Sequence, residues 1–595
     1  MGFEHGTSRI WGLAGLVCML RFGFAMGFWE GGKRTGLEIG REERFSVLDP
    51  NDHKHYFPSQ VCYNWAKTNV PFIDFPDIDI MRAYYYRWCS YRKHIKNTKS
   101  IDGFVVSEFK ENVPWAGLHN TISAAAGHHI MEGRWIKNQK ILDDYIRFWF
   151  LNAESKIDRY TNWIIWASLE RSKITGNTTI LRQIYPKAVG IFFDVYVPKY
   201  LSSSPRNKKD WPGGRHCWRQ TDDRDAMEVS VSGSGCRTSI ASVMYGEASA
   251  LAEIARICKD PKRAEIFSKW ASFSRSVLLE QNWNPKTGFF STIPSPKRPL
   301  VPDSVIQLKG ECDLNARRTP NKTVDVRELF GFMPWYYSDP DKPLIPLSQA
   351  RKYSHMFNYL LPEKIEEGFY AKWGLRTLPK ADKCYNYSYT HGDCWNGPSW
   401  PFETSRVLHS LAGFLNEYKS KKELGLENET PKITSNLFGL LLRQYARQHT
   451  RTYAVNDTAL TSGSGHIFEN LHPDYGYWNN RNIMYSKQAT NKDMGDDYNH
   501  SVFCDLVLSG LLGIRNGRTE SGIWMVLNPL LDPAFTTRFI ADGIRYKGHD
   551  VTVIYNQHTR GEKLRVLVDG VLVAYRDTLG RLEVTVEAIS DLKNH

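Results

Sequence analysis

Most of the chain repeats the apolar spacing of amphipathic helices, and this pattern stops near residue 518. Apolar residues recur every three to four positions, which predicts α-helices. The stretches are 141–152, 161–173, 180–200, 239–259, 261–281, 324–337, 347–361, 400–418, 433–449 and 498–514. Between alternate stretches lie loops rich in Gly, Pro, Asn, Asp and Trp. This arrangement predicts a closed ring of helical hairpins with its long loops at one end. A βαβ fold would need regularly interspersed buried strands, and the sequence pattern contains none, so this fold is disfavoured.

The residues before this region already show organised structure. A turn at Pro76-Asp77 leads into a helical stretch with Ile80, Tyr84 and Trp88 on one face. Residues 103–109 are a short strand or loop. A helix that begins with small residues follows and continues to Trp135. Residues 30–60 have no sustained period and are typical of an arm or linker.

Beyond residue 518 the apolar spacing changes from 3.6 to 2. Six short segments alternate apolar and polar residues, with Asp569-Gly570 as a hairpin turn, and predict a small antiparallel β module. We therefore expect a mainly α protein in three parts. These are an N-terminal arm over 1–45 that includes a candidate signal or anchor segment, a helical catalytic domain over 46–515, and a β-sandwich-like module over 516–595.

Composition narrows the class of protein. Hydrophobic residues make up 42% and aromatic residues 13% of the chain, which indicates a globular fold. The net charge of +13 is dispersed, with short basic clusters only at 93–99, 206–209 and 419–422. A nucleic-acid binder concentrates such charge on one face or tail, so we expect no nucleic-acid partner.

The cysteines and sequons bear on the compartment. None of the ten cysteines forms a CxxC motif, so no zinc or redox site is predicted, and disulfide connectivity stays open. Residues 10–29 are largely apolar but contain Arg21, and stay open between a signal peptide, an anchor and a misassigned start. We expect a secreted or secretory-pathway glycoprotein, with the cytoplasm as the alternative, and no stable membrane partner unless this segment is retained. Five sequons begin at Asn177, Asn321, Asn386, Asn428 and Asn456.

The stretch 394–405, CWNGPSWPFETS, predicts a sugar-binding loop. It places Trp395 and Trp400 around an Asn396-Gly397-Pro398 turn, just before an apolar helical run. Flat indole rings suit the C–H faces of a sugar, and nearby amides and carboxylates suit its hydroxyl groups. A buried turn with two core tryptophans is the alternative interpretation.

Two carboxylate-bearing loops are candidate catalytic elements. The first, 221–237, crowds Asp222, Asp223, Asp225 and Glu228 together, and crowding raises a carboxyl pKa as a general acid requires. The second, 464–478, surrounds Glu469 with aromatic residues. Solvated loops are the plain alternative for both. Two carboxylates across a tryptophan loop are what glycoside hydrolysis needs, and their separation distinguishes inversion from retention.

Other chemistries find less support in the sequence. His128-His129 with Glu132 is not HExxH, so we expect no metal site. Ser232-Gly-Ser-Gly is not a GxSxG nucleophile elbow, and no Gly-rich loop carries the Lys-Ser/Thr of a phosphate site. We expect no cofactor.

Together these motifs resemble the six-hairpin glycosidases related to glycoside hydrolase family 63, the processing α-glucosidases and mannosylglycerate hydrolases, and also family 142. The carriers, in the same order as in those enzymes, are RDAMEVSVSGSG, VRELFGFMPWYY, GFYAKWGLRT, CWNGPSWPFETS, GHIFENLHPDYGYW and HSVFCDLVLSGLLGI. The resemblance implies an (α/α)6 barrel followed by the β module, and an inverting mechanism.

The resemblance also implies residue roles. Glu228 takes the place of the general acid, with Asp225 as fallback, although the processing enzymes have Asp at the position of Glu228. Glu469 takes the place of the base. Asn396 replaces the Arg of the family's Trp-Arg-Gly-Pro loop, which removes a rigid five-donor fork, so the hydroxyl pattern that is read differs. The substrate-binding candidates are Trp395, Asn396, Gly397, Trp400, Trp115, Arg237, Glu108, Glu403 and Trp478.

The function expected from the sequence is hydrolysis of a glycosidic bond in an oligosaccharide or glycan. The enzyme is expected to be exo-acting and α-glucosidase/α-mannosidase-like or arabinofuranosidase-like. The alternatives are a non-catalytic carbohydrate-binding protein on the same scaffold, and an (α/α)-barrel lyase or phosphorylase. A structural helical-repeat protein is disfavoured because no fixed-length repeat occurs.

Overall fold

The computed structural model describes residues 47–202, 216–295, 321–339, 342–385, 395–450, 466–479, 495–532 and 536–592. All of them belong to one compact unit, Phe45–His595. In the residues described, no helix is both long enough and apolar enough to cross a membrane.

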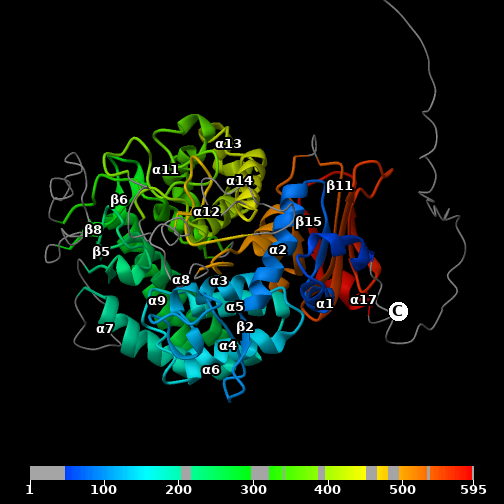
Figure 1. Cartoon of the computed structure of the whole chain (residues 1–595), viewed down its shortest axis with the longest axis horizontal. Coiled ribbons are helices and arrows are strands. Elements are labelled where there is room, and N and C mark those ends of the chain that lie inside the picture. Colours follow the sequence, from blue (N-terminus) through cyan, green and yellow to red (C-terminus); the bar gives the residue numbers. More distant parts are fainter. Residues whose placement is uncertain are drawn as a thin grey trace, which may run out of the picture. The chain divides into compact units, whose positions relative to one another are not determined.

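Helices are the main secondary structure of this unit (Figure 1). In chain order they are α1 (Gln60–Asn69), α2 (Ile78–His94), α3 (Ser123–Gly133), α4 (Gln139–Leu151), α5 (Ile164–Thr175), α6 (Thr179–Gly190), α7 (Val197–Tyr200), α8 (Thr238–Ile257), α9 (Pro261–Val277), α10 (Met333–Tyr336), α11 (Ala350–Ser354), α12 (Pro401–Gly413), α13 (Leu426–Glu429), α14 (Ser435–Gln448), α16 (Phe503–Asp505) and α17 (Val586–Asp591). A π-helical turn, Leu506–Leu511, continues α16.

The contacts between helices form a closed cycle. Helix α3 contacts α5, α5 contacts α8, α8 contacts α10, and α10 contacts α12. Helix α12 contacts the π-helical turn after α16, and α16 contacts α3. A second set packs against this cycle, because α4 lies on α6, α9 on α8, and α14 on both α12 and α2.

The two sets differ in sequence for a physical reason. Helix α8, which belongs to the cycle, is buried on nearly all sides and consists largely of small and apolar residues. Gly246 in α8 is needed there, because a Cβ atom would lie 2.1 Å from the Tyr337 ring. Helix α9 instead buries one stripe, which includes Phe267, Trp270 and Val277. An apolar stripe on one face is typical of a helix whose other face contacts solvent.

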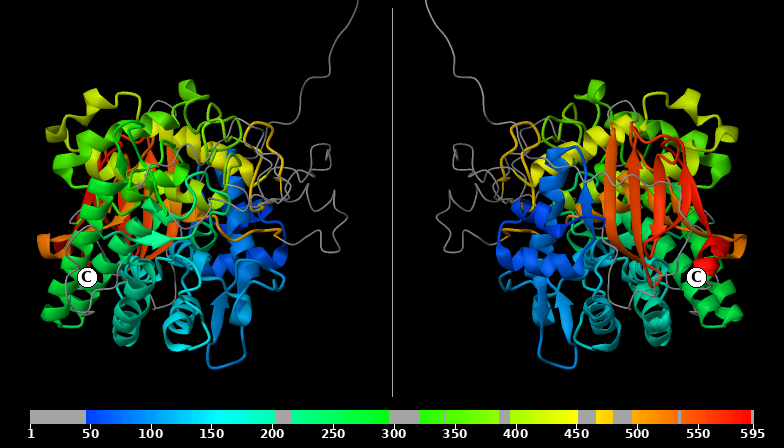
Figure 2. Two further views of the ribbon diagram at one scale, coloured as in Figure 1. Left: turned by 90° about the vertical axis from the view of Figure 1, so that its left-hand side faces the viewer. Right: turned by 90° about the vertical axis from the view of Figure 1, so that its right-hand side faces the viewer.

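The strands form one large and several small sheets. The largest has the order β1-β11-β12-β13-β14 and its strands lie side by side in Figure 2. Its members are β1 (Phe72–Asp74), β11 (Arg538–Tyr546), β12 (His549–Asn556), β13 (Leu564–Val568) and β14 (Val571–Arg576). A three-stranded sheet is formed by β15 (Leu582–Thr585), β10 (Ile523–Leu527) and β9 (Ile514–Asn516). The short strands are β2 (Ile95–Asn97), β3 (Phe104–Val106), β4 (Arg219–Gln220), β5 (Gly235–Cys236), β6 (Trp283–Asn284), β7 (Phe289–Phe290) and β8 (Ile293–Pro294).

Five of the six predicted C-terminal β segments are confirmed, and so is the turn between β13 and β14. The sixth, 581–589, is a strand only to Thr585, because α17 begins at Val586. Asp569 and Gly570 both have positive φ, 49° and 82°, as the tight hairpin turns that match strand twist require. One strand of the large sheet comes from far away in the sequence. β1 pairs antiparallel with β11, Phe72 opposite Asp542. The division into three parts at residues 45 and 515 stays a prediction.

Three predicted helices are shorter than their apolar spacing suggested. In 324–337, only a 3-10 turn at Leu329–Phe332 and α10 are helical, because the backbone of Val324 bonds instead to Thr292. The stretch 347–361 is divided between 3-10 turns and α11. In 498–514, helix begins only at Phe503, because the backbone of Asn499 bonds to Glu108.

Disulfides join two pairs of described cysteines, Cys62 with Cys89 and Cys217 with Cys236. The second disulfide joins the two ends of the loop that precedes α8 and contains Glu228. Cys384 is also disulfide-bonded. The thiol of Cys504 is free and buried.

Candidate active site

Loops that lead into helices of the cycle bring the predicted site residues together. Glu108 lies between β3 and α3, Glu228 in the loop before α8, and Trp395 in the loop before α12. Glu469 lies between α14 and α16. These residues, far apart in sequence, thus lie in long loops that precede helices of the cycle, as predicted.

The segment Trp395–Ser399 connects the two carboxylate loops through backbone hydrogen bonds. The N–H of Trp395 donates to the carbonyl of Glu228 at 3.1 Å. Ser399 and Leu471, two residues beyond Glu469, exchange bonds of 2.9 and 2.8 Å in both directions. The tryptophan loop therefore lies between the loop of Glu228 and the loop of Glu469.

Tyr498 shows that the carboxylates converge. Its hydroxyl donates to Oε1 of Glu108 at 2.6 Å. Burial raises the pKa of Tyr498 well above its usual value, and the charges of Glu108, Glu469 and Glu228 raise it further. Glu228 and Glu108 also raise the pKa of Tyr160, after burial. Three carboxylates from three loops thus act on one phenol.

The Glu228 loop is strained on both sides of the carboxylate. Ala226 and Val229 have φ of 55° and 61°, the left-handed region that a β-branched residue rarely adopts. Strain of this kind costs on the order of 1–3 kcal/mol and persists where surrounding contacts fix the backbone. Glu228 itself is half-buried, as is Glu469.

Arg237 holds this loop from inside the protein. Its Nε donates to Asp225 Oδ2 at 2.7 Å and its Nη1 to Ser230 Oγ at 3.0 Å. A third bond goes to the carbonyl of Gly233, and the guanidinium lies 4.7 Å from the centre of the Phe330 ring. Arg237 is fully buried, so these contacts position the loop. Its predicted contact with a sugar hydroxyl stays a prediction.

The predicted tryptophans have different surroundings. Trp395 and Trp400 stack on each other, with ring centroids 4.6 Å apart and planes at 15°. Trp478 is fully buried in a cluster with Phe468. Trp115 is 36% exposed and meets the Phe109 ring edge-on at 5.7 Å. Among these four tryptophans, Trp115 therefore offers the largest open face.

The turn after Trp395 is anchored by side chains. The backbone N–H of Gly397 donates to Thr377 Oγ1 at 2.9 Å. Asn396 is buried and donates to the carbonyl of Cys384 at 3.3 Å. Glu403, in the first turn of α12, is buried and paired with Arg406. Burial raises the pKa of Glu403, which Arg406 opposes.

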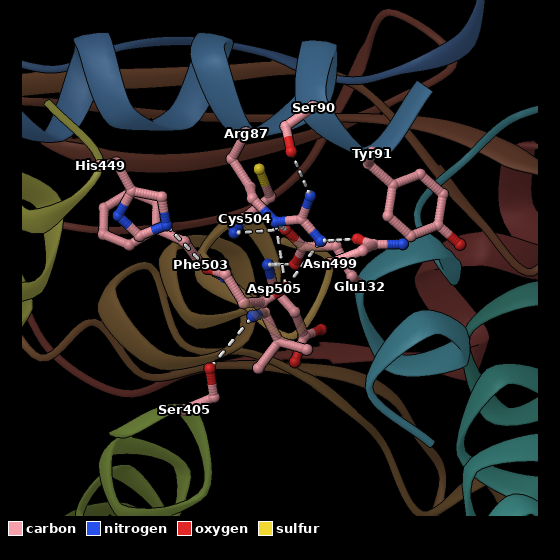
Figure 3. Close-up of polar contacts among 12 residues, drawn as sticks. Arg87, Ser90, Tyr91, Glu132, Ser405, His449, Asn499, Phe503, Cys504 and Asp505 are labelled. Carbon is pink, nitrogen blue, oxygen red and sulfur yellow. Dashed lines mark hydrogen bonds and ion pairs between the residues drawn. The ribbon is translucent and has the colours of Figure 1, made fainter. Parts of the chain in front are cut away.

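A fully partnered polar cluster fixes the segment that carries Tyr498 (Figure 3). Arg87 Nε donates to the carbonyl of Ser501 at 3.0 Å and lies 3.3 Å from Glu132 Oε1. The two oxygens of Glu132 accept the N–H groups of Cys504 (3.2 Å) and Asp505 (2.8 Å) at the start of α16. We call this set the Arg87–Glu132 cluster; its members are Arg87, Ser90, Glu132, Asn499, Ser501, Cys504 and Asp505.

Three residues near the carboxylates were missed by the sequence prediction. Tyr498 is one, and His500 is another, with Nε2 2.6 Å from Glu108 Oε1. The third, His128, is fully buried, and its ring meets that of Phe402. Only the histidine pair of α3 carries a sequence signal, and that signal suggests a metal motif. In the residues described, no group of three His, Cys, Asp or Glu side chains is placed to hold a metal ion.

Comparison with known families decides the class of the protein. The model for the mannosylglycerate hydrolase MGH1-like glycoside hydrolase domain matches residues 118–501. The chain belongs to this glycoside hydrolase family. The matched range contains the loops of Glu228, Trp395 and Glu469 and most helices of the cycle. No curated protein sequence matches the chain significantly.

The solved structures similar to this chain include glycosidases. A sialidase is similar over 91% of this chain at 25% identity, with a TM-score of 0.73, and this chain spans 45% of that protein. A GH63 mannosylglycerate hydrolase from Thermus thermophilus, in complex with glucose, aligns with 72% of this chain and 99% of its own at 12% identity and a TM-score of 0.42. A GH78 rhamnosidase of Bacillus sp. GL1 aligns with 84% of this chain and over 41% of its own length, at 12% identity and a TM-score of 0.44.

Proposed function

We propose that this family member is an exo-acting glycosidase in which Glu228 is the general acid and Glu469 the general base. The observation that supports this most strongly is that the Trp395–Ser399 segment forms backbone hydrogen bonds with the loops of both residues. The pKa of Tyr498, which burial and the charge of Glu108 raise, is also raised by the charges of Glu469 and Glu228.

The proposed chemistry is hydrolysis with inversion. Glu228 protonates the oxygen of the glycosidic bond as the bond to the sugar carbon breaks. Glu469 removes a proton from a water molecule that attacks the same carbon from the opposite face. Trp115, Trp395, Trp400 and Trp478 are proposed to contact the sugar rings or to shape the pocket around them.

Glu228 suits the acid role better than Asp225. The Asp225 carboxylate is buried, ion-paired with Arg237 at 2.7 Å and bonded to the hydroxyl of Ser239. A general acid must release and regain a proton in each cycle. The Asp225 carboxylate is already engaged by the Arg237 guanidinium and the Ser239 hydroxyl, which disfavours Asp225 as the acid. Glu228 is half-buried, so solvent and substrate can reach it.

We further propose that the cycle of helices is the inner ring of an (α/α)6 barrel. Six helical positions succeed one another around it: α3, α5, α8, α10, α12 and α16 with its π-helical turn. The site loops precede several of these helices, so they would open at one end of the barrel.

The substrate class proposed is a neutral glycan cleaved at its terminal sugar, as α-glucosidase-, α-mannosidase- or arabinofuranosidase-like enzymes do. We also propose that the protein passes through the secretory pathway. The two disulfides between described residues favour an oxidising compartment. The sequon asparagines Asn177, Asn321 and Asn428 are exposed; Asn386 and Asn456 lie outside the described residues.

The test is hydrolysis of a panel of α- and β-linked 4-nitrophenyl glycosides of glucose, mannose, rhamnose and arabinofuranose. Proton NMR of the first product molecules gives the anomer released, and inversion is expected. Retention would remove the base role of Glu469. Binding of these sugars without cleavage of any glycoside would favour the carbohydrate-binding alternative.

A further inference from the structure

A second group of polar side chains borders the proposed catalytic loops and has no role in the chemistry above. It surrounds the ring of Phe402 near the start of α12. The Phe402 ring centroid lies 4.6 Å from that of His128 and 4.8 Å from that of His500. The Arg406 guanidinium lies 4.3 Å from the same centroid. We call this set the Phe402 cluster; its members are His128, Trp395, Phe402, Glu403, Arg406 and His500.

These side chains are buried, yet many of their polar atoms have no hydrogen-bond partner among the described residues. The atoms are both ring nitrogens of His128, Nδ1 of His500, Nε1 of Trp395, Nε of Arg406 and Oε1 of Glu403. Native proteins pair the large majority of buried polar side-chain atoms. So many unpaired atoms around one ring indicate that a ligand, or water that a ligand displaces, completes their hydrogen bonds.

The Phe402 cluster adjoins the proposed machinery on two sides. Trp395 bonds through its backbone to Glu228, and the charge of Asp225 acts on Glu403. On the other side, His500 contacts Glu108, whose Oε2 is itself buried and unpaired among the described residues. The Tyr498 ring lies 4.1 Å from that of His500. A sugar ring held by the Phe402 cluster would therefore lie beside Glu108 and the loop of Glu228.

The donor and acceptor set fits sugar hydroxyl groups. Burial lowers the pKa of His128 well below its usual value, and the charge of Arg406 lowers it further, so the imidazole is neutral and can both donate and accept. A hydroxyl group has the same two capacities. The unpaired oxygens of Glu108 and Glu403 accept hydrogen bonds. Since the charge of Glu403 is balanced by its ion pair with Arg406, the Glu108 carboxylate is the group that disfavours a negatively charged sugar at this position.

We propose that the Phe402 cluster is the floor of the innermost sugar subsite, where His128 and His500 bind hydroxyl groups of a neutral sugar ring. This inference rests on the proposed function, because it assumes that Glu228 protonates a bond to that ring. His128 and His500 are then specificity-determining residues, and acidic sugars such as sialic or uronic acids are not substrates.

Calorimetry on the inactive Glu469→Gln protein tests the proposal without turnover. The ligands are glucose, galactose, mannose, rhamnose and arabinose as neutral sugars, and glucuronic and N-acetylneuraminic acids as acidic ones. We expect a neutral sugar to bind most tightly. Adding His128→Phe, which keeps a ring but removes both nitrogens, should weaken that binding by about 10- to 100-fold, the loss expected for one or two buried hydrogen bonds.

A matched control is His53→Phe in the same background. His53 is also buried among aromatic rings, with Phe72 and Tyr85 nearby, but it contacts none of the Phe402 cluster. The His53 variant should bind the sugar as tightly as its parent. Melting temperatures of both variants show whether either is misfolded.

If His128→Phe does not fold, the Glu469→Gln protein is tested instead with mono-deoxy analogues of the sugar that binds most tightly. Removal of at least one hydroxyl group should weaken binding by about 10-fold or more. Tightest binding by an acidic sugar, no binding by any neutral sugar, or equal affinity of both phenylalanine variants would overturn the inference. Sugar binding through His128, together with no hydrolysis of any glycoside by the wild-type enzyme, would instead overturn the proposed function.

Discussion

His128 and His129 are consecutive residues of α3 and both are fully buried, yet their surroundings are opposite. His129 Nε2 lies 2.8 Å from the carbonyl of Asn499, and Nδ1 lies 3.0 Å from the hydroxyl of Tyr145. Neither nitrogen of His128 has a partner among the described residues.

The same contrast separates the two clusters to which this helix contributes, through Glu132 and His128. In the Arg87–Glu132 cluster every guanidinium nitrogen and both carboxylate oxygens are hydrogen-bonded. In the Phe402 cluster, Glu403 and Arg406 pair with each other but keep atoms without a partner among the described residues. A polar cluster that satisfies itself stabilises the fold, whereas one that does not is suited to receive a ligand.

The largest effect predicted from this contrast is on catalysis. Glu228→Gln and Glu469→Gln should each lower kcat by about 10³-fold, because each removes a proton-transfer group. Both residues are half-buried, so the free energy of unfolding should change by less than about 1 kcal/mol. Steady-state kinetics and urea unfolding measure the two quantities. Near-normal kcat in either variant would remove that residue from its role.

A substitution in the Arg87–Glu132 cluster should instead lower the stability of the fold. Arg87→Met leaves the buried Glu132 without its ion pair and should cost about 3–5 kcal/mol of unfolding free energy. Arg263→Met is the control, since its ion pair with Asp260 is exposed and is worth about 1 kcal/mol at most. Equal losses in the two variants, measured by chemical unfolding, would contradict a structural role for the cluster.

A third prediction concerns a buried carboxyl of the helical core. Burial raises the pKa of Glu247 in α8 to about 8, although it accepts N–H bonds from Trp166 and Ile165. The folded state therefore holds this proton more tightly than the unfolded state, where the pKa is about 4.3. Its stabilising contribution is complete below about pH 4 and is lost as the pH rises to 8.

Glu247→Gln provides the comparison. Relative to this variant, the wild-type protein should lose up to about 1.4 kcal/mol of stability per pH unit within that window. Unfolding curves at several pH values measure the difference. If the difference in unfolding free energy between the wild type and Glu247→Gln stayed constant from pH 4 to 8, Glu247 would have the same protonation in the folded and unfolded states, which would contradict this prediction.

The smallest effect concerns strain in the Glu228 loop. Val229→Gly removes the strain of a left-handed valine, which stabilises the folded state by about 1–2 kcal/mol. Glycine also adds backbone entropy to the unfolded state, which costs about 1 kcal/mol of stability. Stability should therefore change little, while kcat falls about 10-fold because Glu228 is held less firmly. Lys259→Gly, at a left-handed exposed residue between α8 and α9, should leave kcat unchanged. Equal kcat in both variants would contradict a role for the strain.

Much of the fold could be predicted from apolar spacing, because α8, α9 and the hairpin at Asp569-Gly570 follow from local sequence. The spacing failed at 324–337 and 498–502, where backbone bonds to distant segments replace helical ones. Among the predicted site residues, Trp395 does bond to the backbone of Glu228, and the charges of Glu108 and Glu228 both raise the pKa of Tyr498. Tyr498 and His500 could not be found this way, since their positions depend on the Arg87–Glu132 cluster, whose members come from three separate helices and a loop.

Leaving-group dependence is the most direct test of the central claim, that Glu228 and Glu469 divide acid and base roles. The measurement is kcat/KM of both glutamine variants on 4-nitrophenyl and 2,4-dinitrophenyl forms of one cleaved glycoside. Because 2,4-dinitrophenolate leaves without a proton, Glu228→Gln should recover to within about 10-fold of wild type on that substrate, whereas Glu469→Gln should stay about 10³-fold impaired on both. Equal impairment of Glu228→Gln on the two substrates, or recovery of Glu469→Gln instead, would contradict the assignment.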